Sequence, residues 1–293
     1  MFNTLTSIKE ILIDTLIDSI KLLPFLFFTY LFMEYIEHKM NHKSKKAIQK
    51  SGKFGPFWGS LLGIFPQCGF SVSATNLYAG RVITLGTLIA VYLSTSDEML
   101  PIFISEAVSP VVILKILAIK LVIGIIAGFI IDFVINVLSK NKREEKENIE
   151  QVCEEEHCHC NKNGILKSSI HHTLNIFIYV IIISFIINSI VNFIGEESIS
   201  NLLLNKPIIG PLVSALIGLI PNCAASVIIT NMYLQQIISF GSMMAGLLTG
   251  AGIGLAVLFK TNNKFKENIK IVLLLYFIGF ITGIILDFLQ IIF

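Results

Sequence analysis

The sequence predicts an all-α polytopic membrane protein made of two inverted-topology repeats, and three observations lead to this fold class. Of the 293 residues, 54% are hydrophobic and only 14% are charged, and the apolar residues form blocks of about 20 or more, long enough to cross a bilayer. The chain also contains an internal duplication, and its lysines are concentrated in particular loops. Each repeat is expected to have a first span, a re-entrant helical hairpin and two further spans, giving ten apolar helical pieces.

The first span is expected at residues 11–37. It has neither a basic amino-terminal region nor a small-residue cleavage site, so it is interpreted as a retained membrane span rather than a signal peptide. The first membrane repeat is predicted to cover residues 1–138, a linker residues 139–169, and the second membrane repeat residues 170–293.

The duplication is seen when the sequence is compared with itself at an offset of 155 residues. Residues 55–93 then align with residues 210–248 without a gap, and 15 of the 39 positions are identical. Chance similarity between apolar segments would give scattered Leu and Ile identities, whereas these matches include proline, cysteine, asparagine and glycine. The same offset pairs Asp132 with Asp287 farther along the chain.

The loop charges predict how the two copies lie in the membrane, because basic loops remain on the cytoplasmic side. Residues 38–53 contain six lysines and residues 260–270 contain four, whereas residues 195–207, after the first span of the second half, contain one. The first repeat is therefore expected to be entered from the cytoplasm and the second from outside. The central linker is therefore expected in the cytoplasm and both termini outside.

The re-entrant hairpin follows from counting the crossings in the first half. Residues 82–106 and 110–138 are expected to cross outward and back, so residues 56–80 must enter and leave on the cytoplasmic side. The predicted arms are residues 56–66 and 69–80, with Arg81 at the cytoplasmic exit.

The two hairpin tips are the predicted substrate site. Pro66 and Pro221 remove a backbone donor and clash with the preceding turn, so each interrupts its helix at membrane depth. Interrupted helices persist in membranes where they are buried in protein or line a wet cavity, and transporter sites are commonly built this way. The candidate residues are Gln67, Cys68, Ser71, Thr75 and Asn76, with their counterparts Asn222, Cys223, Ser226, Thr230 and Asn231.

Spacing supports a shared face for part of this set. Cys68, Ser71 and Thr75 lie at i, i+3 and i+7, which is one stripe of a helix, with Asn76 beside it. For the serines and threonines the alternative is a structural role, in which their hydroxyls bond to the backbone or to neighbouring helices.

Acidic residues distinguish the two halves at one position. Asp97 and Glu98 lie in an apolar span, whereas the aligned residues 248–256 contain glycines and no acid. An ionised acid at a helix centre costs roughly 2.5 kcal/mol or more and usually marks an ion path. Alternatively, this stretch lies at the membrane interface or pairs with Lys115 or Lys120. The glycines either bring the backbone close to the site or help helices pack.

The linker carries a separate cluster of candidate metal ligands. Residues 153–160 contain three cysteines, two histidines and three glutamates. Thiolate and imidazole groups bind zinc, copper and other thiophilic cations. The cluster is interpreted as an accessory cytoplasmic metal site, the alternative being an acidic linker with incidental cysteines. Its candidate ligands are Cys153, His157, Cys158, His159 and Cys160.

The tip sequences GIFPQCGFSVSATNLYAG and GLIPNCAASVIITNMYLQ, the STSDEMLP segment and the five-plus-five arrangement resemble a bacterial family of ten-helix heavy-metal exporters. Its members are also described as manganese transporters or arsenic efflux proteins. The resemblance covers nearly the whole chain and implies export of a metal or metalloid ion.

The leading hypothesis is a secondary transporter that exports manganese(II) and alternately exposes a midplane site, with Asp97 or Glu98 carrying coupling protons. The alternative is efflux of arsenite or organoarsenicals through Cys68 and Cys223, since paired thiols suit trivalent arsenic. The expected partners are the bilayer, the ion and coupling protons, with no nucleic acid and no required cofactor, and a homo-oligomer is compatible with the sequence. A passive channel stays an alternative. An enzyme is not expected, because a cysteine nucleophile needs a base within hydrogen-bond reach and all six histidines are expected in loops or at a membrane entrance.

Overall fold

The computed structural model of the chain is built from helices, and no strand occurs among the residues that it describes. In the described part of the chain, six helical stretches are long and apolar enough to cross a membrane, which confirms the predicted class of an all-helical polytopic membrane protein. The described residues are 12–13, 15–17, 19–20, 22–24, 26–32, 35, 54–65, 69–96, 98–139, 165–194 and 208–290.

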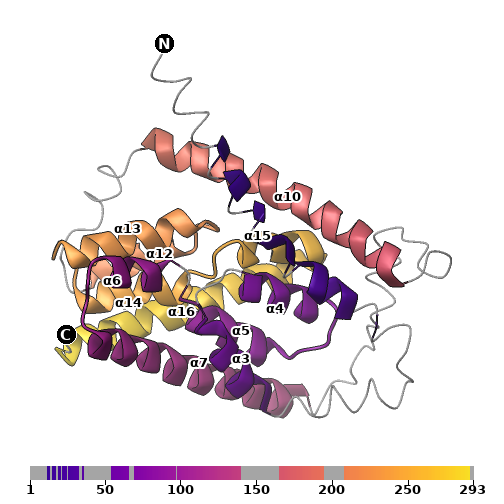
Figure 1. Cartoon of the computed structure of the whole chain (residues 1–293). Coiled ribbons are helices and arrows are strands. Elements are labelled where there is room, and N and C mark those ends of the chain that lie inside the picture. The colour runs from indigo at the N-terminus through magenta and orange to yellow at the C-terminus, as the bar shows by residue number, and fades with distance from the viewer. Residues whose placement is uncertain are drawn as a thin grey trace, which may run out of the picture.

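The first half contains one span followed by two short helices, a broken span and a long helix (Figure 1). The candidate first span is Thr15–Phe32, and the broken span, Leu85–Ser105, is interrupted after Ser94, at residues 95–96. The helices after the first span are α3 (Gly55–Gly63), α4 (Gly69–Ala79), α5 (Leu85–Ser94), α6 (Met99–Ser105) and α7 (Pro110–Ser139).

The second half repeats this order after its own first helix, and its second long span is interrupted at residues 250–253. The 155-residue offset places α5 on α14 from the first residue to the last. The opposite membrane orientation of the two halves stays a prediction. The helices are α10 (Ile165–Ile194), α12 (Ile209–Gly218), α13 (Cys223–Leu234), α14 (Phe240–Thr249), α15 (Gly254–Thr261) and α16 (Phe265–Phe288).

An aspartate fixes the start of α5. Thr84 is the N-cap residue, and its side chain accepts a hydrogen bond from the Thr87 amide. Asp132, near the end of α7, accepts from the Gly86 amide at 2.9 Å and from the Thr84 hydroxyl at 2.7 Å. The carboxylate therefore satisfies backbone and cap donors at the electropositive end of the helix.

The second half repeats this arrangement with Ser239 and Asp287. Asp287 accepts from the Gly241 amide at 2.7 Å and from the Ser239 hydroxyl at 2.8 Å. A Cβ on Gly241 would lie 2.2 Å from the Gly283 carbonyl oxygen and 2.5 Å from the Asp287 carboxylate. Glycine is therefore required where α14 meets α16.

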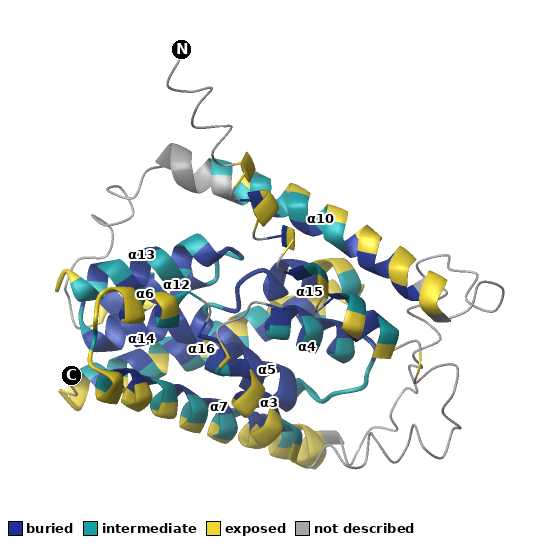
Figure 2. Cartoon of the chain, viewed as in Figure 1, coloured by how far each residue is buried: buried dark blue, intermediate teal, exposed yellow. Residues whose placement is uncertain are grey.

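The two broken spans form the centre of the molecule, and the unbroken helices lie around them. Figure 2 shows α5 and α14 almost entirely buried, whereas α7 and α10 each expose one long face. The first span and α10 pack on α4 and α15 through a separate apolar cluster. Its members are Leu22, Leu26, Tyr30, Val72, Ile176, Val180, Ile253 and Val257.

Candidate functional site

A buried hydroxyl cluster joins α4 of the first half to α15 of the second. Thr75, fully buried on α4, has its Oγ1 atom 2.5 Å from the Tyr92 hydroxyl of α5. Thr75 Oγ1 also lies 3.1 Å from the carbonyl oxygen of Gly254, the first residue of α15, and the Tyr92 hydroxyl oxygen lies 3.3 Å from that carbonyl oxygen. Three chain segments therefore converge where α14 has ended and α15 begins.

Glycine allows this close approach. A Cβ on Gly254 would lie 3.0 Å from both Cβ and Oγ of Ser71, which is tighter than nearly all real contacts. Ser71 is itself fully buried, and its carbonyl oxygen accepts from the Thr75 hydroxyl at 2.7 Å. The Gly254 backbone therefore lies against a predicted site residue in a contact that also packs α15 on α4, so both explanations for the glycines after α14 stay open.

Asn76 faces a different neighbour from Thr75. Tyr30, on the first span, donates through its hydroxyl to Asn76 Oδ1 at 3.4 Å. Thr29 donates to Ser73 at 2.7 Å on the same side of α4. The Asn76 side chain is buried, and its Nδ2 atom has no hydrogen-bond partner in the described part of the chain.

The counterpart helix α13 has local bonds instead. Asn222 is its N-cap and accepts from the Ala224 amide at 3.4 Å, and Cys223 is its buried first residue. The Ser226 hydroxyl donates to the Cys223 carbonyl at 2.8 Å, and the Thr230 hydroxyl donates to the Ser226 carbonyl at 2.7 Å. These bonds match the structural alternative for serine and threonine.

The two halves also differ in how deeply the equivalent helices are buried. Ser71 and Asn76 are buried on α4, whereas their counterparts Ser226 and Asn231 on α13 are partly exposed. In the same way, the first five residues of α15 are buried, while three residues of α6 are exposed. The α4 and α15 side is therefore the more closed of the two.

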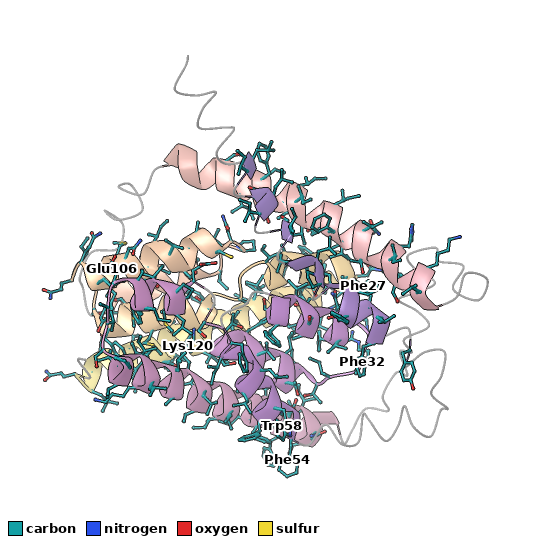
Figure 3. The ribbon with its side chains drawn as sticks, viewed as in Figure 1. Phe27, Phe32, Phe54, Trp58, Glu106 and Lys120 are labelled. Atoms are coloured by element: carbon teal, nitrogen blue, oxygen red, sulfur yellow. The ribbon has the colours of Figure 1, made fainter. Side chains whose placement is uncertain are left out.

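Lys120, which was expected only as a possible partner for the stretch that contains Asp97 and Glu98, lies at the break that follows α5. Lys120 of α7 is fully buried, and its Nζ donates to the Thr95 carbonyl and, at 3.0 Å, to the Leu247 carbonyl. Figure 3 places Lys120 inside the bundle, whereas Phe54 and Trp58 point outward from α3. Together with Tyr92, Lys120 is a polar residue of the interior that the comparison of repeats did not select.

Several predicted ligands lie outside the described residues, namely Gln67, Cys68, Asp97 and the linker set Cys153, His157, Cys158, His159 and Cys160. Glu98 is described, is partly buried and directly precedes α6. Within the described residues, no group of three or more His, Cys, Asp or Glu side chains is arranged to hold a metal ion.

An ion pair joins the exit of α4 to the start of α16. Arg81 donates to the Glu267 carboxylate through two nitrogens, at 2.8 and 3.2 Å, and the Tyr78 hydroxyl donates to the same group. Arg81 and its counterpart Gln236 both have a positive φ, of 55° and 60°. The same left-handed turn thus ends α4 and α13, but the basic residue occurs only in the first half.

A family model described as "Putative, 10TM heavy-metal exporter" matches residues 7–200, about two-thirds of the chain. The chain belongs to this family. Neither the search of curated proteins nor that of solved structures gave a match.

For this heavy-metal exporter family member, the match covers the first span and all helices from α3 to α10. It therefore includes Thr75, Tyr92 and Lys120, whereas Gly254 and Leu247 lie beyond it. The family and the six apolar spans together indicate a multi-pass membrane transporter rather than an enzyme.

Proposed function

We propose that the chain is a secondary transporter that exports a metal or metalloid ion, with manganese(II) as the first candidate, by alternately exposing a site between its two halves. The observation that carries this proposal is the placement of α4 on the break between α14 and α15. Thr75 and Tyr92 meet the Gly254 carbonyl there, in the buried centre of the molecule. Broken helices that expose backbone at membrane depth are a recurrent construction of transporter sites.

The predicted inverted arrangement of the repeats supports alternating access. The α4 and α15 side is closed in this structure and the α13 and α6 side is more exposed. If the two sides exchange these states, the site faces opposite sides of the membrane in turn. The ion pair between Arg81 and Glu267 fits this view, because the hairpin exit and the basic segment before α16 are both predicted to be cytoplasmic.

Manganese(II) is the first candidate because hard oxygen donors dominate the predicted set. Asp97 and Glu98 supply carboxylates, and Asn76, Asn231, Gln67 and Asn222 supply amide oxygens. In this proposal Asp97 or Glu98 also carries the coupling proton. The chain resides in a bacterial inner membrane, with residues 139–169 cytoplasmic.

Arsenite is the second candidate, and one described residue favours it. Cys223 is a buried thiol at the start of α13, at the position that corresponds to Cys68. Trivalent arsenic is a soft centre that binds thiolates, so paired tip cysteines would be its natural ligands.

Uptake into everted membrane vesicles tests the proposal and separates the two candidates. Manganese export predicts energy-dependent uptake of Mn²⁺ that falls roughly tenfold or more in Asp97→Asn, because a charged ligand is lost. Glu106→Gln, at an exposed acid after α6, is the matched control and is expected to retain activity. Arsenite uptake that depends on Cys68 and Cys223 in serine variants would favour the second candidate.

Two results would contradict this account. Manganese uptake that is undiminished in Asp97→Asn would remove the acid from the site. Vesicles that take up neither ion, with the protein present and monodisperse after extraction, would contradict the proposed function itself.

A further inference from the structure

Lys120 is a fully buried cation in a helix that carries no charge close to it in sequence except Lys115. It lies ten residues into α7, about 15 Å along the axis from the helix start at 1.5 Å per residue. A buried ammonium is costly at membrane depth, so its surroundings must compensate for the charge.

The two carbonyl groups that Lys120 contacts both lie at helix breaks. Thr95 is the C-cap of α5, where the backbone turns to an extended conformation. Leu247 lies in the last turn of α14, and the amide of Ala251, which would continue that helix, donates instead to Thr249. One ammonium therefore satisfies acceptors at the carboxyl ends of broken helices from both halves.

The helix ends also favour a cation. Each helix carboxyl end is equivalent to roughly −0.5 elementary charge, so both ends attract the ammonium. Carboxyl ends and unwound carbonyls of broken helices are also the groups that coordinate the coupling Na⁺ or H⁺ in transporters built from inverted repeats. The cation is a feature of the first half alone, because the counterpart of Lys120 is Leu275, which is equally buried.

We propose that the Lys120 ammonium is a built-in cation that occupies the position of a coupling alkali ion and holds the breaks of α5 and α14 together. The inference rests on the proposed transport function only in assigning the site a coupling role. It follows that the native protein needs neither Na⁺ nor K⁺.

Thermal unfolding of the purified full chain tests the cation site without requiring transport. Lys120→Ala removes the ammonium and leaves room for an ion, whereas Lys120→Met keeps the length of the side chain without its charge. Both variants are expected to unfold roughly 5 °C or more below the native protein in choline chloride, because two charge-assisted hydrogen bonds are lost. Na⁺, K⁺ or ethylammonium chloride is expected to raise the unfolding temperature of Lys120→Ala saturably, and to leave Lys120→Met unchanged.

Leu275→Ala is the matched control, since it creates a similar space at the equivalent position without removing a charge. It is expected to lose stability and to show no specific response to these cations. The native protein should likewise unfold at the same temperature in choline, Na⁺ and K⁺ at equal ionic strength.

Three results would overturn the inference. One is an alkali-ion requirement or a specific stabilisation by Na⁺ or K⁺ in the native protein, which can be measured even if Lys120→Ala does not fold. Another is a folded Lys120→Ala that none of the three cations stabilises. The third is recovery of Lys120→Ala by Asp97→Asn instead of by added cations, which would make Lys120 a partner of that acid alone.

Transport measured on the same samples separates this inference from the proposed function. One outcome is that the native protein moves no ion and that its stability is insensitive to alkali ions, whereas Lys120→Ala is stabilised by them. This outcome contradicts the proposed function and supports the cation site. Native protein whose ion transport requires Na⁺ or K⁺ supports the proposed function and overturns the cation site.

Discussion

Thr75 and Thr230 occupy equivalent positions but have different contacts in the two halves. Thr75 contacts the Tyr92 hydroxyl and the Gly254 carbonyl, and so joins three segments. Both hydroxyls donate to the carbonyl one turn earlier in their own helix, that of Ser71 or Ser226, and this local bond is the contact that the described residues give Thr230. The hydroxyl of Thr75 therefore contributes to packing between helices, and that of Thr230 does not.

This difference predicts unequal effects of the same substitution. Thr75→Val is expected to lower the free energy of unfolding by roughly 0.6–1.7 kcal/mol, the range for hydrogen bonds between membrane helices. Thr230→Val is the matched control and is expected to change it by less than about 0.5 kcal/mol, because a bond to the i−4 carbonyl contributes little. Equilibrium unfolding in mixed micelles measures both values, and equal losses in the two variants would contradict the assigned contacts.

Comparison of the two repeats identified part of the candidate site from the sequence and missed the rest for a physical reason. The offset of 155 residues selects polar residues that occur in both halves, and Ser71 and Thr75 were found in this way. Tyr92 and Lys120 correspond to Leu247 and Leu275, so the comparison passes over them. Asn76 follows Thr75 by one residue, or about 100° around the helix, which is why it contacts the first span.

Among the elements, the short helices lie close to where the proline and the repeat predicted them. Helices α3 (Gly55–Gly63) and α4 (Gly69–Ala79) cover most of the arms expected at residues 56–66 and 69–80, and their assembly into a re-entrant hairpin stays a prediction. The crossing of α4 over α15 was not predictable, because a pattern within one half carries no information on which helix of the other half covers it. The break after α14 is marked in the sequence only by glycines, which are compatible with packing as well as with a break.

The exits of α4 and α13 test the re-entrant hairpins. Single cysteines at positions 81 and 236, in a chain without its native cysteines, are expected to react with a membrane-impermeant thiol reagent from opposite sides. Arg81→Cys should react only in everted vesicles and Gln236→Cys only in intact cells, because the loop charges place the first exit in the cytoplasm. The cysteine-free chain gives the background, and labelling of both positions from one side would contradict the inverted topology.

Across the whole molecule, similar halves carry an unequal distribution of charge. Asp132 and Asp287 hold the start of the broken spans in the same way in each half. In contrast, Arg81 and Lys120 are replaced by Gln236 and Leu275. The shared residues build the scaffold, and the charged residues of the first half distinguish one side of the transporter from the other.

In the proposed transport cycle, the contact between α4 and α15 must open for the ion to pass. Ser71 and Gly254 offer a direct test, since a Cβ on Gly254 would lie 3.0 Å from the Ser71 Cβ. Paired cysteines there can be oxidised to a disulfide once α4 and α15 move apart by roughly 0.5–1 Å, because the Cβ atoms of a disulfide are about 3.5–4.5 Å apart. The measurement is ion uptake by proteoliposomes containing Ser71→Cys/Gly254→Cys, before oxidation, after oxidation and after reduction, with each single variant as a control. Oxidation is expected to stop uptake only in the double variant, and reduction is expected to restore it. A fully cross-linked protein that transports as fast as the same protein after reduction of the disulfide would contradict this expectation.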